Sequence, residues 1–125
     1  MVQTDISQNA AECADWRQAL RTYRDEFSYD KKALESLCRS TLSKDQLQQV
    51  EHFHNQFHIQ LINIHDLKQT IKAHERNLER YNEAHESPSE ELLAKHEELY
   101  DRFSSMEATL LDLRNEFNNF RSQAG

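Results

Sequence analysis

The sequence is poor in the residues that build tight turns, with one glycine and one proline among 125 residues. Average proteins contain about 7% glycine and about 5% proline. Because hairpins, bulges and phosphate-cradling loops need these residues, their scarcity disfavours folds built from strands. Long apolar runs are missing too, since no segment approaches the roughly 20 residues that cross a bilayer. The first ten residues, MVQTDISQNA, lack the basic start and apolar centre of a signal peptide, so we expect a cytoplasmic protein with no membrane partner.

An excess of positive charge is also missing. Lys and Arg number 15 against 22 Asp and Glu, which gives a net charge of −7. Nucleic-acid binding needs a basic face that neutralises phosphates, so this balance disfavours a nucleic-acid partner. The chain has instead 30% charged residues, a composition typical of long solvated helices with narrow apolar seams. We therefore expect an all-α fold.

Cysteine is scarce, with two residues that both fall in the first expected helix. Cys13 and Cys38 are 25 positions apart, which is about 37 Å along a helix, so they cannot form a disulfide with each other. We expect both thiols to be reduced and buried.

Two short stretches interrupt an otherwise continuous helical pattern. In the first, Ser43 is followed three residues later by Gln46, which predicts a capping box. In the second, Ser87 can cap a helix that has Pro88 at its first position and Glu90 at its third. We therefore expect one domain, residues 1–125, with helices at about 7–40, 44–86 and 88–123.

Each expected helix carries apolar residues at alternating spacings of three and four, which places them on one stripe. Such seams, joined by short connections, predict an elongated antiparallel three-helix bundle, left-handed and packed like a coiled coil. The polar members of the seams are Asp30, Gln60, His74 and His96. The other members are Cys13, Trp16, Leu20, Tyr23, Phe27, Leu34 and Leu37; Val50, Phe53, Phe57, Ile64, Leu67, Ile71, Leu78 and Tyr81; and Leu92, Leu99, Phe103, Met106, Leu110, Leu113, Phe117 and Phe120.

The short connections also allow a register estimate. A chain that folds back near residues 42 and 87 places Asp30 level with His54, and places His96 within one turn of His74. A carboxylate beside His54 would form a charge-assisted hydrogen bond that fixes the register, although Asp30 can equally reach water at the surface.

Five of the seven histidines lie between residues 51 and 76, but on a helical wheel they point in different directions. The tightest subset is Glu51, His54 and His58, because spacings of three and four bring side chains to one face, where two histidines can chelate a divalent cation. Asp30 is a candidate third or fourth ligand from the register estimate. The alternative is an ordinary solvated surface, and a dedicated zinc site needs three or four ligands with partners that orient them.

Two groups of apolar residues are candidates for contact with a protein partner or with a second copy of the chain. One lies at the tip near the second turn, where two helices extend beyond the first, unless the N-terminal residues Val2 to Ile6 cover it. The other lies opposite the seam of the second helix. The tip group comprises Leu78, Tyr81, Leu92 and Leu93, and the second group comprises Ile59 and Ile62.

A third set of titratable residues lies around the same tip. His74, His85 and His96 are close to the second turn, and a histidine in a seam resists protonation because the charged form disfavours burial. We expect the tip to loosen below about pH 6.

The long antiparallel arrangement, with Trp16 in the first seam, resembles the architecture of spectrin repeats. The central stretch EHFHNQFHIQLINIHDLKQTIKAHE resembles a group of small uncharacterised bacterial three-helix proteins. This second resemblance implies a cytoplasmic protein that stands alone, and it carries no functional residues.

Minimal loops leave no crevice of the kind in which enzymes place their chemistry, so we expect no enzymatic activity. The leading hypothesis is a structural or interaction module, without cofactor, that binds a protein partner or forms a homo-oligomer such as a dimer. The alternative is a metal-binding or metal-sensing bundle that uses the histidine pair of the second helix.

Overall fold

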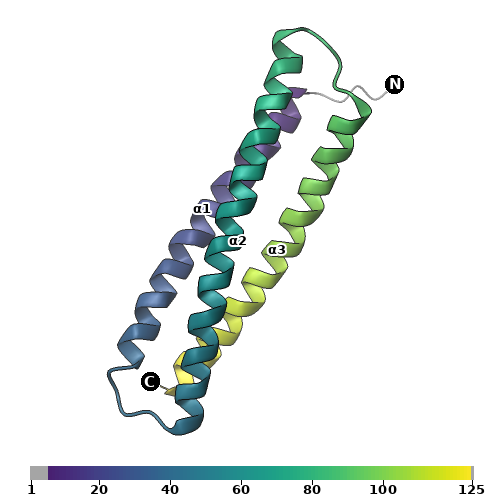
Figure 1. Ribbon diagram of the computed structural model, residues 1–125. Helices are drawn as coiled ribbons and strands as arrows, with labels where there is room; N and C mark the ends of the chain where they lie inside the picture. Colours follow the sequence, from purple (N-terminus) through teal and green to yellow (C-terminus); the bar gives the residue numbers. More distant parts are fainter. Residues whose placement is uncertain (1–5, 125) are drawn as a thin grey trace.

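The structure is a computed structural model that describes residues 6–124. It contains three helices, α1 (Ile6–Leu37), α2 (Lys44–Glu83) and α3 (Glu90–Ala124), and no strand within those residues. The helices lie side by side in a rod, with α2 running opposite to α1 and α3 (Figure 1). No helix in this part of the chain has both the length and the apolar character needed to cross a membrane. The elongated antiparallel three-helix bundle is therefore confirmed.

The core follows the predicted seams along the whole rod. Aromatic rings fill the half near the first turn, where Phe57 lies 5.5 Å from Phe27 and 5.0 Å from Phe117 between ring centroids. All seam residues are buried except five that are half-buried at its edges. The five are Tyr23, Leu37, Tyr81, Met106 and Phe120.

The first turn ends as predicted, with a capping box at the start of α2. The Gln46 backbone N–H donates to Ser43 Oγ at 3.1 Å, and the Ser43 N–H donates to Gln46 Oε1 at 2.9 Å. Cys38 lies just beyond α1 and is exposed, so the expectation of two buried thiols is wrong for Cys38. The reason is that α1 ends at Leu37, three residues before the predicted boundary.

The predicted cap of α3 is wrong by two residues. Ser89, rather than Ser87, caps the helix, because Ser89 Oγ accepts a hydrogen bond from the Leu92 N–H at 3.1 Å. Pro88 therefore precedes the cap, and Glu90 opens the helix instead of completing a capping box. Glu90 and Glu91 in the first turn still stabilise α3 through the positive end of the helix dipole.

The end of α2 explains why the helix stops at Glu83 rather than residue 86. His85 has a φ of 55°, in the left-handed region. The Glu86 N–H donates to the Tyr81 carbonyl at 2.9 Å and the His85 N–H donates to the Asn82 carbonyl at 3.2 Å. This pair of bonds is a Schellman motif, whose left-handed position favours glycine. His85 therefore forms part of the C-terminal cap of α2. It is exposed, whereas His74 and His96 are buried in the bundle.

Replacing His85 with glycine is expected to raise the free energy of unfolding by about 0.5–1 kcal/mol, because glycine adopts the left-handed conformation without steric cost. Urea unfolding followed by far-UV circular dichroism measures this change. A His85→Ala variant, which keeps a β-carbon, is the matched control and should show no gain.

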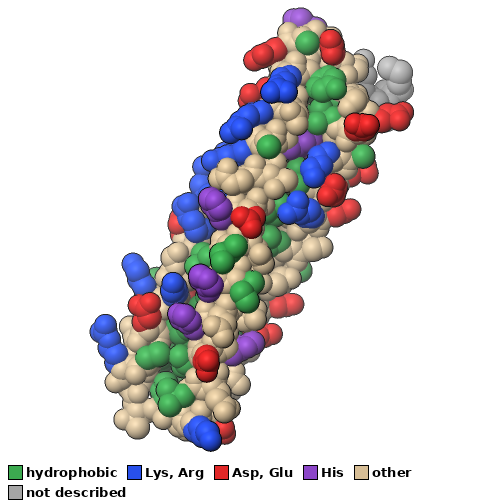
Figure 2. All heavy atoms as spheres, viewed as in Figure 1, with side chains coloured by type: hydrophobic (Ala, Val, Ile, Leu, Met, Phe, Trp, Pro, Cys, Tyr) green, Lys and Arg blue, Asp and Glu red, His purple; other side chains and the backbone are tan. Residues whose placement is uncertain are grey.

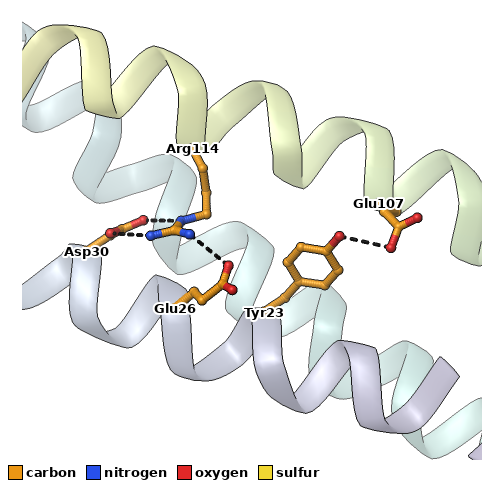
Figure 3. Close-up of polar contacts among 5 residues, drawn as sticks. All are labelled: Tyr23, Glu26, Asp30, Glu107 and Arg114. Atoms are coloured by element: carbon orange, nitrogen blue, oxygen red, sulfur yellow. Dashed lines mark hydrogen bonds and ion pairs between the residues drawn. The ribbon is translucent and has the colours of Figure 1, made fainter. Parts of the chain in front are cut away.

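A buried ion pair fixes α1 against α3 (Figure 3). Arg114 donates from Nε to Asp30 Oδ2 at 2.7 Å and from Nη2 to Oδ1 at 3.0 Å, and its Nη1 donates to Glu26 at 2.8 Å. Nearby, the Tyr23 hydroxyl donates to Glu107 at 2.9 Å. Both oxygens of Asp30 are thus occupied by Arg114, so the predicted bond between Asp30 and His54 is wrong.

Candidate metal centre

The predicted metal set on α2 is not assembled. Glu51, His54 and His58 are all exposed, and Asp30 is fully buried against Arg114. Histidine side chains are spaced along the face of α2 near the first turn rather than gathered at one point (Figure 2). The His54 and His58 pair therefore has solvated surroundings and gains no ligand from Asp30.

A different group of metal-ligating side chains converges inside the bundle. Cys13 of α1, His74 of α2 and His96 of α3 are 0%, 2% and 8% exposed. His74 Nε2 lies 3.0 Å from His96 Nδ1, and Cys13 Sγ lies 4.0 Å from the same nitrogen. One ligand atom from each residue lies within 4.8 Å of the others, and no further His, Cys, Asp or Glu among residues 6–124 joins this group.

The three residues meet because each occupies a seam position at the same height of the rod. The prediction that His96 lies within one turn of His74 is confirmed by their contact. The indole of Trp16 lies against His96, with ring centroids 4.9 Å apart, and holds the imidazole from one side. Cys13 is one turn from Trp16 on the same face of α1, so both residues contact His96.

A single hydrogen bond joins the two imidazoles. Each neutral ring carries a single N–H, so only one of His74 Nε2 and His96 Nδ1 donates while the other accepts. The outward nitrogens, His74 Nδ1 and His96 Nε2, are buried and have no hydrogen-bond partner among residues 6–124. Leaving such buried polar atoms unpaired costs free energy.

Charged residues surround the cluster on its solvent side. Burial and the carboxylates of Glu75 and Glu12 raise the pKa of Cys13 to about 12, and Arg17 partly offsets them. Arg17 itself donates hydrogen bonds to both carboxylate oxygens of Glu75. Glu12 Oε2 lies 3.6 Å from the outward Nε2 of His96. The thiol is therefore neutral near pH 7 without an ion to replace its proton.

Burial also acts on His74. Desolvation lowers the pKa of His74 to about 4, with further lowering by His96 and Lys95 and a small opposing effect of Glu75. The side chain is therefore neutral near pH 7, and its unprotonated nitrogen is available as a ligand.

The free energy of unfolding of the metal-free protein should fall as the pH drops from about 6.5 to about 4. The unfolded chain binds a proton at His74 near pH 6.5, whereas the folded chain binds it only near pH 4, so acid favours unfolding by on the order of 3 kcal/mol. Urea titrations of chelator-treated protein at several pH values measure this loss. A His74→Leu variant lacks the titrating group, and an equal loss in that variant would contradict the assignment.

The structure corrects the predicted apolar strip at the tip. Leu78 is fully buried and Leu92 is 8% exposed, and both belong to the core cluster against which Ile6 of α1 packs. Tyr81 and Leu93 are half-buried. An open groove of about 480 Å³ remains between α2 and α3 there, lined in part by Tyr81 and Leu92. Of the N-terminal segment, Val2 to Asp5 lie outside the described residues.

Ile59 and Ile62 point outward as predicted, with 45% and 47% of their surfaces exposed. Self-association through them stays a prediction. Light scattering of the wild type and of an Ile59→Ser plus Ile62→Ser variant tests it, because a dimer held by these side chains should become a monomer in the variant. A wild type that is monomeric at high concentration would contradict the prediction.

Comparisons of the chain with protein-family models, curated proteins and solved structures find no match. Functional inference therefore rests on the side chains alone.

The sequence analysis identified Cys13, His74 and His96 as seam residues but did not join them into a site. A signal was present, because all three are ligand types at seam positions near the same end of the bundle. The two fold-back estimates together place Cys13 level with Phe103, about two turns from His96, so the register estimate did not bring the thiol to the imidazoles. Glu12, which faces His96, was not singled out in the sequence analysis.

Proposed function

We propose that the protein is a non-enzymatic helical bundle of the cytoplasm that binds one thiophilic transition-metal ion between its helices. The ligands are Cys13 Sγ, His74 Nε2 and His96 Nδ1. The observation that carries the proposal is the convergence of three buried ligand atoms, one from each helix, within 4.8 Å of one another.

The spacing of the three atoms suits a first-row metal ion. Bond lengths of about 2.0 Å to nitrogen and about 2.3 Å to sulfur require separations of about 3.4 Å between nitrogens and about 3.6 Å between sulfur and nitrogen. The separation between the nitrogens of His74 and His96 is 3.0 Å, and that between Cys13 Sγ and His96 Nδ1 is 4.0 Å. The third separation, between Cys13 Sγ and His74 Nε2, is within 4.8 Å, so the thiol would have to move toward His74 for all three atoms to reach bonding distance.

The donor types are those that transition metals select. A thiolate with two imidazoles favours zinc and copper over calcium and magnesium, which prefer oxygen ligands. A bound ion would displace the thiol proton, and the N–H between the imidazoles would move to the outward nitrogen of its own ring. Each ring would then carry its proton on the outward nitrogen, where Glu12 faces His96 as carboxylates commonly face metal-bound histidines.

Packing alone gives no reason for this cluster. The neighbouring seam positions are filled by apolar residues, and replacing a buried polar pair with apolar side chains is commonly neutral or stabilising. A double substitution, His74→Leu plus His96→Leu, should therefore fold at least as stably as the wild type without metal. It provides a folded protein that lacks two ligands.

Equilibrium dialysis of chelator-treated protein against zinc(II), nickel(II) and anaerobic copper(I), followed by elemental analysis, tests the proposal. We expect one tightly held ion per wild-type chain and none in the double leucine variant or in Cys13→Ala. The matched controls are Cys38→Ser, which removes the exposed thiol, and His54→Ala plus His58→Ala, which removes the surface pair. Equal retention by the wild type and the double leucine variant, or loss only with His54 and His58, would overturn the proposal.

A further inference from the structure

We infer that the ion is monovalent copper, held in three-coordinate geometry by Cys13, His74 and His96. This inference rests on the proposed function and adds the identity of the metal and the number of its protein ligands.

The first argument is the number of ligands. Structural zinc sites almost always have four protein ligands, and zinc sites with three protein ligands complete their shell with water or substrate. No fourth His, Cys, Asp or Glu in the described part of the chain brings a ligand atom into the group. Monovalent copper is selected by soft thiolate ligands and is also suited to imidazole, and three ligands satisfy it.

The two nearest carboxylates do not fill the missing position. Glu75 is paired with Arg17 by both oxygens, and moving it would leave that guanidinium without its partner. Glu12 lies on the outer side of His96, at 3.6 Å from Nε2, whereas the ligand nitrogen is Nδ1. Glu12 is therefore placed to accept the outward N–H of His96 rather than to bind the ion.

The second argument is charge. The ligand residues are between 0% and 8% exposed, and a net charge in such surroundings is costly. The charges of a monovalent ion and one thiolate cancel, so the copper centre has no net charge. A divalent ion with the same ligands leaves one positive charge in the core, beside the Trp16 indole and the surrounding apolar seam.

The third argument is solvent access. A divalent ion needs a water molecule or another small ligand at its fourth position. The three ligands come from three different helices, with Cys13 fully buried and the Trp16 ring against that of His96. A three-coordinate ion needs no such ligand, so it suits the closed packing without local opening.

Competition for copper(I) against the coloured bicinchoninate complex, under anaerobic conditions with ascorbate, tests the inference. We expect the wild type to withdraw one equivalent of copper. Cys13→Ala, His74→Leu and His96→Leu should each weaken the apparent affinity at least tenfold, because each removes one of three ligands. The reference protein carries Cys38→Ser, His54→Ala and His58→Ala, so that surface ligands do not contribute, and it should behave as the wild type does.

Zinc(II) titrated into the same proteins against a chromogenic chelator completes the test. The expected Kd is about 1 μM or higher, which means weaker binding than at structural zinc sites. A zinc Kd of about 10 nM or tighter that depends on the same three residues would overturn the copper assignment and leave metal binding intact. Copper binding that depends on only two of the residues would also overturn three-coordination. Failure of both metals to bind would overturn the proposed function itself.

Discussion

Free metal buffered at about a thousand times its Kd is expected to raise the free energy of unfolding by about 4 kcal/mol, which corresponds to a rise in Tm of about 12 °C for a chain of this size. The physical reason is that the ion binds the folded chain, where three helices hold Cys13, His74 and His96 together, and loses these combined ligands on unfolding. Thermal unfolding followed by circular dichroism, with and without buffered metal, measures the shift.

The control for this prediction separates the core from the surface histidines. The His54→Ala plus His58→Ala variant should keep the whole shift, since both residues are exposed and distant in sequence from the cluster. Cys13→Ala should lose it. A shift that survives in Cys13→Ala would show that stabilisation arises from ligands other than the buried cluster.

Replacing Arg114 with alanine is expected to lower the free energy of unfolding by about 3 kcal/mol or more. The carboxylate of Asp30 is 0% exposed, and both its oxygens accept hydrogen bonds from Arg114. Without the guanidinium, a buried charge has no partner, and Glu26 nearby adds repulsion. Urea unfolding measures the loss, and Arg102→Ala, an exposed arginine on the same helix, should change stability by less than about 0.5 kcal/mol.

The double variant Asp30→Leu plus Arg114→Leu tests whether the ion pair contributes net stability to the folded protein. Because apolar side chains of similar size can replace a buried ion pair without loss, its stability should return close to that of the wild type. A double variant as unstable as Arg114→Ala would show that the pair contributes net stability rather than fixing the register of α1 against α3.

The fold could be predicted because apolar spacing alone determines which face of each helix is buried. Even the polar members of the seams, Asp30, Gln60, His74 and His96, proved to be buried as their positions required. The first turn was also predictable, since the capping box of Ser43 and Gln46 depends on local sequence. At the second turn the local signal was ambiguous, because two serines flank Pro88 and both precede glutamates. The left-handed conformation of His85, which ends α2 early, has no clear signal in the sequence.

The site could be predicted only in part, because it depends on contacts between helices. The fold-back near residue 87 was close to the observed pairing of His74 with His96, which is centred on residue 85. Cys13 was missed because its alignment with His96 depends on both turns, and the errors of the two estimates combine. Asp30 was assigned to the wrong helix for a related reason. Its partner Arg114 lies beside the seam of α3, and a long side chain reaches across from a position that apolar spacing does not mark.

The most direct test of the account is X-ray absorption spectroscopy at the metal edge on the protein loaded with one equivalent of copper(I). We expect one sulfur and two imidazole nitrogens around the ion, with the sulfur lost in Cys13→Ser and one imidazole lost in His96→Leu. A spectrum with only nitrogen and oxygen ligands, or one unchanged by these substitutions, would contradict a metal centre built from Cys13, His74 and His96.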